Sequence, residues 1–153
     1  MILELKSILQ PKYLNSEYKR KLLQSYKGDY EKSSNENGYI VKINNIIDIV
    51  SSHINNNNDI IIVSKCNCSI FKPIPNMEVN CKIDLIHVNG LFMSKYDIKI
   101  MVPKSDEYIF KSDHILINNK KYIVGNNLDI IIIDVRYYKN IYSCIGKLIL
   151  KEN

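Results

Sequence analysis

Two prolines one residue apart, Pro73 and Pro75, constrain this chain more than any other feature of its sequence. Each proline lacks an N–H donor and biases the residue before it toward an extended conformation, so a β-sheet cannot run through this stretch without interruption. The segment before the prolines ends with the aromatic Phe71. We therefore predict a rigid inter-domain corner at Phe71, Pro73 and Pro75, with one domain over residues 1–73 and a second over residues 74–153.

The start of the chain predicts a strand followed by a helix. Residues 1–9 alternate with a period of two, which favours a half-buried strand, and Pro11 ends it. An amphipathic helix is expected to begin at Asn15 or Ser16 and to end near Gly28, because large side chains then recur every four residues. The residues with this spacing are Tyr18, Leu22 and Tyr26.

Two further strands are predicted before the corner, at residues 38–49 and 59–71. A polar interruption at residues 44–45 breaks the first of them, and the asparagine tract at residues 55–58 predicts an exposed hairpin loop between the two. The first domain is thus expected to be an α+β unit, with an antiparallel sheet and one covering helix.

The chain after the corner predicts five strands. Five is the strand count of an OB barrel, so an all-β OB fold is the expected architecture of the second domain. Turns are expected at residues 88–90, near Asp97 and at residues 139–140, and the long segment 103–127 favours loops and a short hairpin over a helix. The predicted strands cover residues 77–88, 91–96, 98–102, 128–138 and 141–150.

The four cysteines are expected to be core thiols. A zinc site completed by histidine is the functional alternative, but such sites normally use paired Cys-x-x-Cys loops. Cys66 and Cys68 are instead two residues apart in an extended stretch, which puts them on one face of a strand. Buried free thiols fit a reducing compartment such as the cytosol or nucleus. The other two cysteines are Cys81 and Cys144.

Charge and motifs point away from an enzyme. The net charge of +5 comes mostly from lysine, which suggests diffuse attraction to polyanions. The sequence contains no Gly-rich phosphate loop, metalloprotease motif or nucleophile elbow, so we predict no catalytic residues, no metal site and no cofactor. It also has no apolar run long enough for a membrane span, so an intracellular protein without membrane contact is expected.

A candidate RNA site lies on the second predicted strand of the barrel. Phe92 and Tyr96 share one face of that strand, and OB barrels bind single strands on this face by stacking bases on aromatic rings. Lys82 and Lys99, on the neighbouring strands, are expected to meet phosphates. The alternative is that Phe92 and Tyr96 only cover the barrel or a partner interface.

The order of these signals resembles the seventh-subunit family of RNA polymerase II and its archaeal stalk counterpart. The residues that carry the resemblance are the aromatic-Lys-Pro corner at residues 71–73, the Gly-x-Phe strand at 90–92, and the segments at 9–13 and 38–41. The resemblance implies a polymerase-docking tip domain, followed by an RNA-binding OB barrel of the ribosomal-protein-S-one type. The glycine-rich turn that the family has after its third barrel strand is replaced here by residues 101–105.

By this resemblance, the tip domain docks near the largest and sixth polymerase subunits through Pro11, Tyr13, Gly38 and Tyr39. A helical fourth-subunit-like protein is the implied further partner, and nascent single-stranded RNA is the implied ligand of the barrel. The expected function is therefore a non-catalytic polymerase stalk subunit; a free-standing OB-fold RNA-binding protein in translation or RNA metabolism is the alternative.

The resemblance also implies where the protein works. A stalk subunit is expected in the nucleus, or in a viral factory or virion if the source is a virus. Isoleucine and asparagine are very frequent and alanine, threonine and tryptophan are absent, a bias that favours an AT-rich protist or a large DNA virus.

Overall fold

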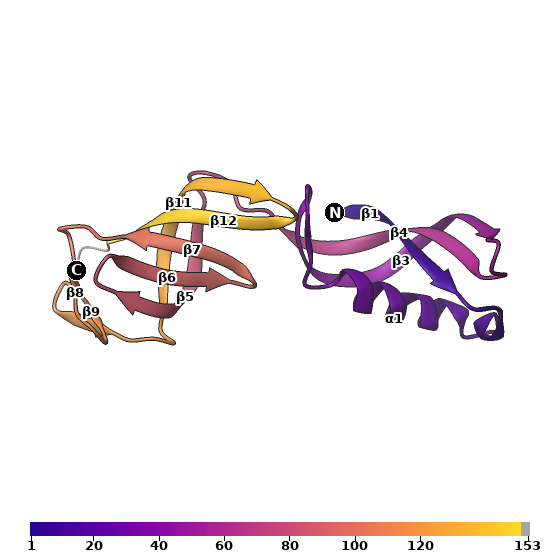
Figure 1. Ribbon diagram of the computed structural model, residues 1–153, viewed down its shortest axis with the longest axis horizontal. Coiled ribbons are helices and arrows are strands. Elements are labelled where there is room, and N and C mark those ends of the chain that lie inside the picture. The colour runs from indigo at the N-terminus through magenta and orange to yellow at the C-terminus, as the bar shows by residue number, and fades with distance from the viewer. Residues whose placement is uncertain (151–153) are drawn as a thin grey trace. The chain divides into compact units, whose positions relative to one another are not determined.

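The computed structural model describes residues 1–150, and the chain divides into two compact units (Figure 1). The first unit is Met1–Lys72 and the second starts at Pro73, one residue before the boundary expected from the sequence. The first unit combines a sheet with a helix, and the second is built from strands. No helix within residues 1–150 has the length and apolar character needed to cross a membrane.

The sheet of the first unit has four antiparallel strands in the order β1-β4-β3-β2. In β1 every second side chain is buried and the others face solvent, which confirms the predicted half-buried strand. The bounds of the strands are β1 Ile2–Leu9, β2 Ser34–Asn35, β3 Gly38–Ile54 and β4 Ile60–Phe71.

Strands β3 and β4 form one long hairpin. The Asn55 side chain closes its loop by accepting hydrogen bonds from the backbone N–H groups of Asn57 and Asp59, both at 2.9 Å. This confirms the loop predicted from the asparagine tract. The pairing slips between Ile43 and Asn45, where the polar interruption was expected. The interruption is therefore a β-bulge that bends β3 without ending it.

Helix α1, Tyr18–Tyr30, covers one face of this sheet (Figure 1). Its fully buried residues Leu22 and Tyr26 face the sheet, and the Tyr26 hydroxyl lies 2.8 Å from the Ser64 hydroxyl on β4. The predicted helix and its apolar stripe are confirmed. Lysine, arginine and glutamine in this segment favour a helix, and burial of Leu22 and Tyr26 holds the helix on the sheet.

Both predicted ends of the helix were wrong. The chain first makes a short 3-10 turn over Pro11–Tyr13, and the Asn15 side chain accepts a hydrogen bond from the Glu17 N–H instead of capping the helix. At the other end the helix runs past Gly28 to Tyr30, whose hydroxyl donates to the Lys6 carbonyl at 2.8 Å. That contact outweighs the modest cost of a glycine inside a helix.

The second unit is a closed five-stranded barrel with an OB-like strand order, β11-β12-β7-β6-β5. All neighbouring strands are antiparallel except β12 and β7, which are parallel. The five predicted strands are confirmed, with ends that differ by at most two residues. Their bounds are β5 Glu78–His87, β6 Gly90–Lys95, β7 Ile98–Pro103, β11 Asn127–Tyr138 and β12 Ile141–Leu148.

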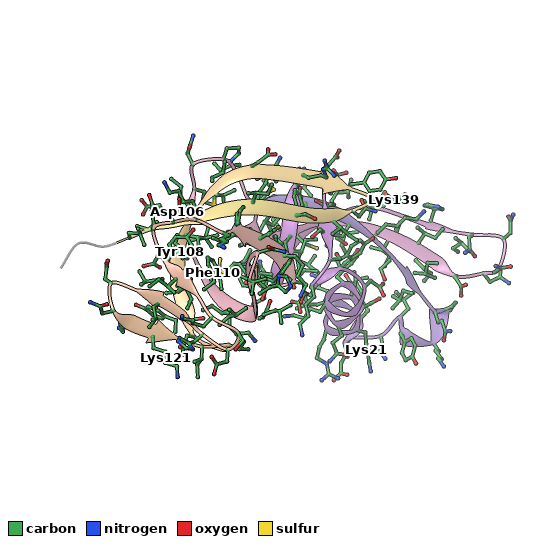
Figure 2. The ribbon with its side chains drawn as sticks, turned by 60° about the vertical axis from the view of Figure 1, so that its left-hand side comes forward. Lys21, Asp106, Tyr108, Phe110, Lys121 and Lys139 are labelled. Carbon is green, nitrogen blue, oxygen red and sulfur yellow. The ribbon has the colours of Figure 1, made fainter. Side chains whose placement is uncertain are left out.

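A small three-stranded sheet lies between β7 and β11 in the chain. It consists of β8 Ile109–Phe110, β9 Ile115–Ile117 and β10 Lys120–Tyr122. The predicted short hairpin is confirmed, with Asn118 and Asn119 at positive φ in its turn. Near its start, the Tyr108 and Phe110 rings meet edge to face at 5.3 Å between centroids (Figure 2).

At Gly90 the backbone of β7 lies too close to β6 for a side chain. A Cβ added at Gly90 would lie 2.4 Å from the Val102 carbonyl oxygen, and its φ of +156° is one that other residues rarely adopt. The turn predicted at residues 88–90 therefore needs glycine at its last position, because the backbone of β7 occupies the space of a side chain.

We expect Gly90→Ala to destabilise the barrel by about 2–4 kcal/mol through strain and overpacking. Gly28→Ala is the matched control, since nothing lies within 4 Å of a Cβ there and alanine favours a helix; it should stabilise the first unit by about 0.5–1 kcal/mol. Urea unfolding followed by circular dichroism measures both changes. An unchanged midpoint for Gly90→Ala would contradict the close approach of β6 and β7.

All four cysteines are buried as free thiols, which confirms their predicted place in the core. Cys66 and Cys68 lie on the inner face of β4, and Cys81 and Cys144 lie inside the barrel. Burial raises the thiol pKa of Cys66 to about 11 and that of Cys81 to about 12. These thiols therefore stay protonated, as small apolar core groups, across the physiological pH range.

The raised thiol pKa values predict a loss of stability in alkali. In the unfolded chain a thiol ionises near its ordinary pKa of 9.0. Because the folded pKa of Cys81 is higher, its contribution to stability is complete below pH 9 and is lost as the pH rises toward 12. The urea midpoint under reducing conditions should fall between pH 9 and 11, and the midpoint of Cys81→Val should fall less steeply over the same range. Equal slopes for the two proteins would contradict the assignment.

Candidate nucleic-acid interface

A row of exposed apolar side chains crosses the outer surface of the barrel. Strand pairing aligns Leu85 on β5 with Phe92 on β6, Phe92 with Met101 on β7, and Met101 with Ile145 on β12. Their exposed fractions are 53%, 41%, 36% and 43% respectively. The neighbours of Phe92 along β6, Leu91 and Met93, are buried. The alternation predicted for this strand is therefore confirmed, with Phe92 outside.

A second row, polar and basic, runs beside the apolar row. Four of its members lie two residues along a strand from the apolar row or its continuation on β11, and Lys82 lies three residues from Leu85 across a β-bulge, so the rows are roughly 7 Å apart. Strand pairing links its members in the order Lys82, Ser94, Lys99, Ser143 and Arg136, across β5, β6, β7, β12 and β11. Three cations thus alternate with two hydroxyl groups along one line.

Between the two rows the surface has a depression of about 340 Å³, on the side of the barrel where β7, β12 and β11 meet. The lining of the depression combines apolar and polar side chains, with Cys144 among them. Its other lining residues are Met101, Asp134, Arg136, Ser143 and Ile145.

The cations of the basic row are available to a ligand. Lys82 Nζ has only a long contact, 4.0 Å from Asp84 Oδ1, with both side chains partly exposed. Within residues 1–150, neither Lys99 nor Arg136 takes part in an ion pair or a side-chain hydrogen bond. An exposed cation without a protein partner is free to neutralise a phosphate.

Three of the four residues predicted for RNA contact lie together, and the fourth does not. Phe92, Lys82 and Lys99 all face outward on adjacent strands. Tyr96 was predicted to share the strand face with Phe92, but it lies in the β6–β7 turn with φ +55° and has Lys95 Nζ 5.1 Å from its ring centre. The turn uses Tyr96 and Asp97 as its two central residues, which takes Tyr96 out of the strand alternation.

Sequence reasoning missed the half of this surface that β11 and β12 supply. Ile145, Ser143 and Arg136 join Met101 and Lys99 only through the parallel pairing of β12 with β7. No local pattern reveals that pairing, because the two strands are far apart in the sequence. The one available signal was the OB topology itself, which places the fifth strand beside the third.

The predicted docking residues of the first unit fall into two separate groups. Pro11 and Tyr13 are exposed in the 3-10 turn before α1. Gly38 and Tyr39 are buried at the start of β3, where Tyr39 pairs with Phe71 and is only 4% exposed. The Tyr39 side chain therefore belongs to the core and presents no surface to a partner.

An apolar groove of about 720 Å³ lies next to the first of these groups. It starts at Leu14, the residue after Tyr13, and runs between the beginning of α1 and the far end of the β3–β4 hairpin. Among residues 1–150, no lysine, arginine, aspartate or glutamate lines it. The lining residues are Leu14, Tyr18, Ile49, Ser52, His53, Ile54, Ile60 and Ile62.

Within residues 1–150, no group of three or more His, Cys, Asp or Glu side chains is close enough together to hold a metal ion. No family model matches this chain, and no curated protein matches its sequence. The outer surface of the barrel places exposed apolar groups beside a line of cations, and single-strand binders combine these two features.

Two substitutions separate the contribution of base stacking to RNA binding from that of phosphate contact. Phe92→Ala should weaken binding of single-stranded RNA about 5- to 100-fold without changing its dependence on salt, because it removes a stacking surface. Arg136→Met should lower the slope of log affinity against log salt by somewhat under one unit, because it removes one phosphate contact. Fluorescence anisotropy of a labelled oligouridine at several salt concentrations measures both.

Phe92 is 41% exposed, so Phe92→Ala should leave the fold intact. Unfolding of the barrel, or unchanged RNA affinity, would show that Phe92 serves the fold or a protein interface instead.

Proposed function

We propose that this protein is a non-catalytic stalk subunit of a multisubunit DNA-directed RNA polymerase, and that its barrel binds nascent single-stranded RNA. The observation that carries the RNA-binding part is the apolar row beside the basic row on the outside of an OB-like barrel. Single-strand binders combine such stacking surfaces with cations that follow the phosphate backbone.

The polymerase part of the proposal rests on the succession of the two units. The resemblance to the stalk family implies a small α+β unit followed by an OB barrel of the ribosomal-protein-S-one type. This chain has a small α+β unit with one helix, followed by an OB-like barrel. The chain offers the proposed complex an uncharged apolar groove in its first unit. Burial of apolar surface in such a groove supports a stable subunit interface.

In this proposal the first unit docks on the polymerase core near the largest and sixth subunits, and a fourth-subunit-like helical protein is a further partner. The contact residues of the first unit are those around the groove, next to Pro11 and Tyr13. The enzyme's catalytic centre lies in other subunits, and this chain contributes RNA contact. Its place is then the nucleus, or the viral factory or virion of a virus.

Docking is tested by the size of the complex that contains the native protein. It should migrate with an assembly of several hundred kilodaltons that survives moderate salt, since apolar interfaces are not screened by ions. Ile54→Asp, in the groove and 69% exposed, should release the protein from that assembly without weakening oligouridine binding. Ile2→Asp, on an exposed β1 position outside the groove, is the matched control and should stay bound.

Migration of the native protein only as a free monomer would contradict the polymerase role. If oligouridine binding persisted in that case, the protein would be a free-standing OB-fold RNA-binding protein.

A further inference from the structure

The depression between the two rows contains a carboxylate that attraction to phosphates does not explain. Asp134 lines it together with Arg136 and Ser143. A negative charge on a surface that binds a polyanion weakens the attraction to phosphate, unless the carboxylate pairs with a cation or accepts hydrogen bonds from the ligand. Asp134 makes no ion pair among residues 1–150, and its Oδ1 accepts a hydrogen bond from the Val135 N–H at 3.0 Å.

A β-bulge places Asp134 in this position. The pairing of β11 with β12 slips between Ile132 and Asp134, so that one extra residue, Ile133, is inserted. Without that insertion the alternation would turn Asp134 and Arg136 toward the barrel interior, since Ile132 is fully buried. With it, both residues face outward, opposite Ile145 and Ser143 on β12.

The shape and chemistry of the depression fit one nucleobase. Its volume of about 340 Å³ is small, Met101 and Ile145 supply apolar surface for the base, and Arg136 supplies a planar cation for stacking or phosphate contact. Phe92 on β6 pairs with Met101 at the edge of the depression but lies three strands from Asp134 on β11, roughly 14 Å along the sheet. A nucleotide in the depression and one stacked on Phe92 would therefore be different members of one RNA strand.

We propose that this depression is a subsite for an unpaired guanine, with the Asp134 carboxylate accepting hydrogen bonds from the base. A carboxylate is an acceptor only, and guanine presents two adjacent N–H donors, N1–H and the N2 amino group, on its Watson–Crick edge. Uracil presents one N–H between two carbonyl oxygens that a carboxylate repels. Adenine and cytosine each present one amino group beside an acceptor nitrogen.

This inference rests on the proposed RNA-binding function and adds a base preference to it. Without the subsite, aromatic stacking and lysine contacts would bind single strands with little sequence preference. With it, the barrel should favour strands that carry a guanine at one position. The preference comes from β11 and β12, the strands outside the usual strand-two and strand-three surface.

The test uses the full-length protein and labelled uridine octamers that carry one central guanosine, adenosine, cytidine or uridine. The guanosine octamer should bind about 5- to 20-fold more tightly than the all-uridine octamer. This gain in affinity lies in the lower part of the range for a bidentate base contact, because the site is open to solvent. Asp134→Asn should remove this advantage, since an amide presents a donor to one of the two N–H groups. Its affinity for the all-uridine octamer should not fall.

Asp106→Asn is the matched control, because Asp106 is an exposed aspartate in the loop before β8 and undergoes the same change of charge (Figure 2). It should keep the full guanosine advantage.

Equal binding of all four octamers would overturn the guanine subsite and leave the proposed RNA-binding function intact. An advantage that survives Asp134→Asn would overturn the role of Asp134. A preference for RNA over DNA that is lost in Asp134→Asn regardless of the base would assign the carboxylate to the ribose instead. Absence of binding to any octamer would overturn the proposed function and this inference together.

Discussion

The parallel pairing of β12 with β7 is the interaction on which the second unit depends. It joins Ser143, Cys144 and Ile145 to Lys99, Ile100 and Met101, and it is the only parallel contact in the barrel as described over residues 73–150. Without it, two hydrogen-bonding strand edges would be open, and the inner face with Cys144 and Ile100 would be exposed to water. Three residue pairs thus close a barrel whose other contacts are local hairpins or the β5–β11 ladder.

The same pairing builds the candidate interface. It extends the apolar row from Met101 to Ile145 and the basic row from Lys99 to Ser143, so that Arg136 reaches a surface that would otherwise end at β7. The depression that we assign to a base lies across this junction. Barrel closure and the assembly of the ligand surface therefore have one cause, and a substitution that opened the β7–β12 pair would remove both.

Much of this fold could be predicted because its signals are local. Apolar alternation located the barrel strands, and residues that accept a positive φ, such as Asn119 and Asn140, located the hairpin turns. One error fell where a tertiary contact outweighed a local preference, since the contact of Tyr30 with Lys6 carries α1 past Gly28. The other fell at a local turn, because the tight β6–β7 turn begins at Tyr96 and removes it from its strand. Only part of the candidate surface was predicted, because strand register across a non-local pair cannot be read from alternation.

The two apolar surfaces of the protein differ in what surrounds them, and this difference assigns them to different ligands. Among residues 1–150, no lysine or arginine lines the groove near Leu14 and Ile54, so this mostly apolar groove suits the apolar side chains of a protein better than a phosphate. The row through Phe92 and Met101 runs beside three cations, which an uncharged protein segment would leave without partners. A single strand of RNA satisfies both parts of that surface, since its bases cover the apolar row while its phosphates neutralise the cations.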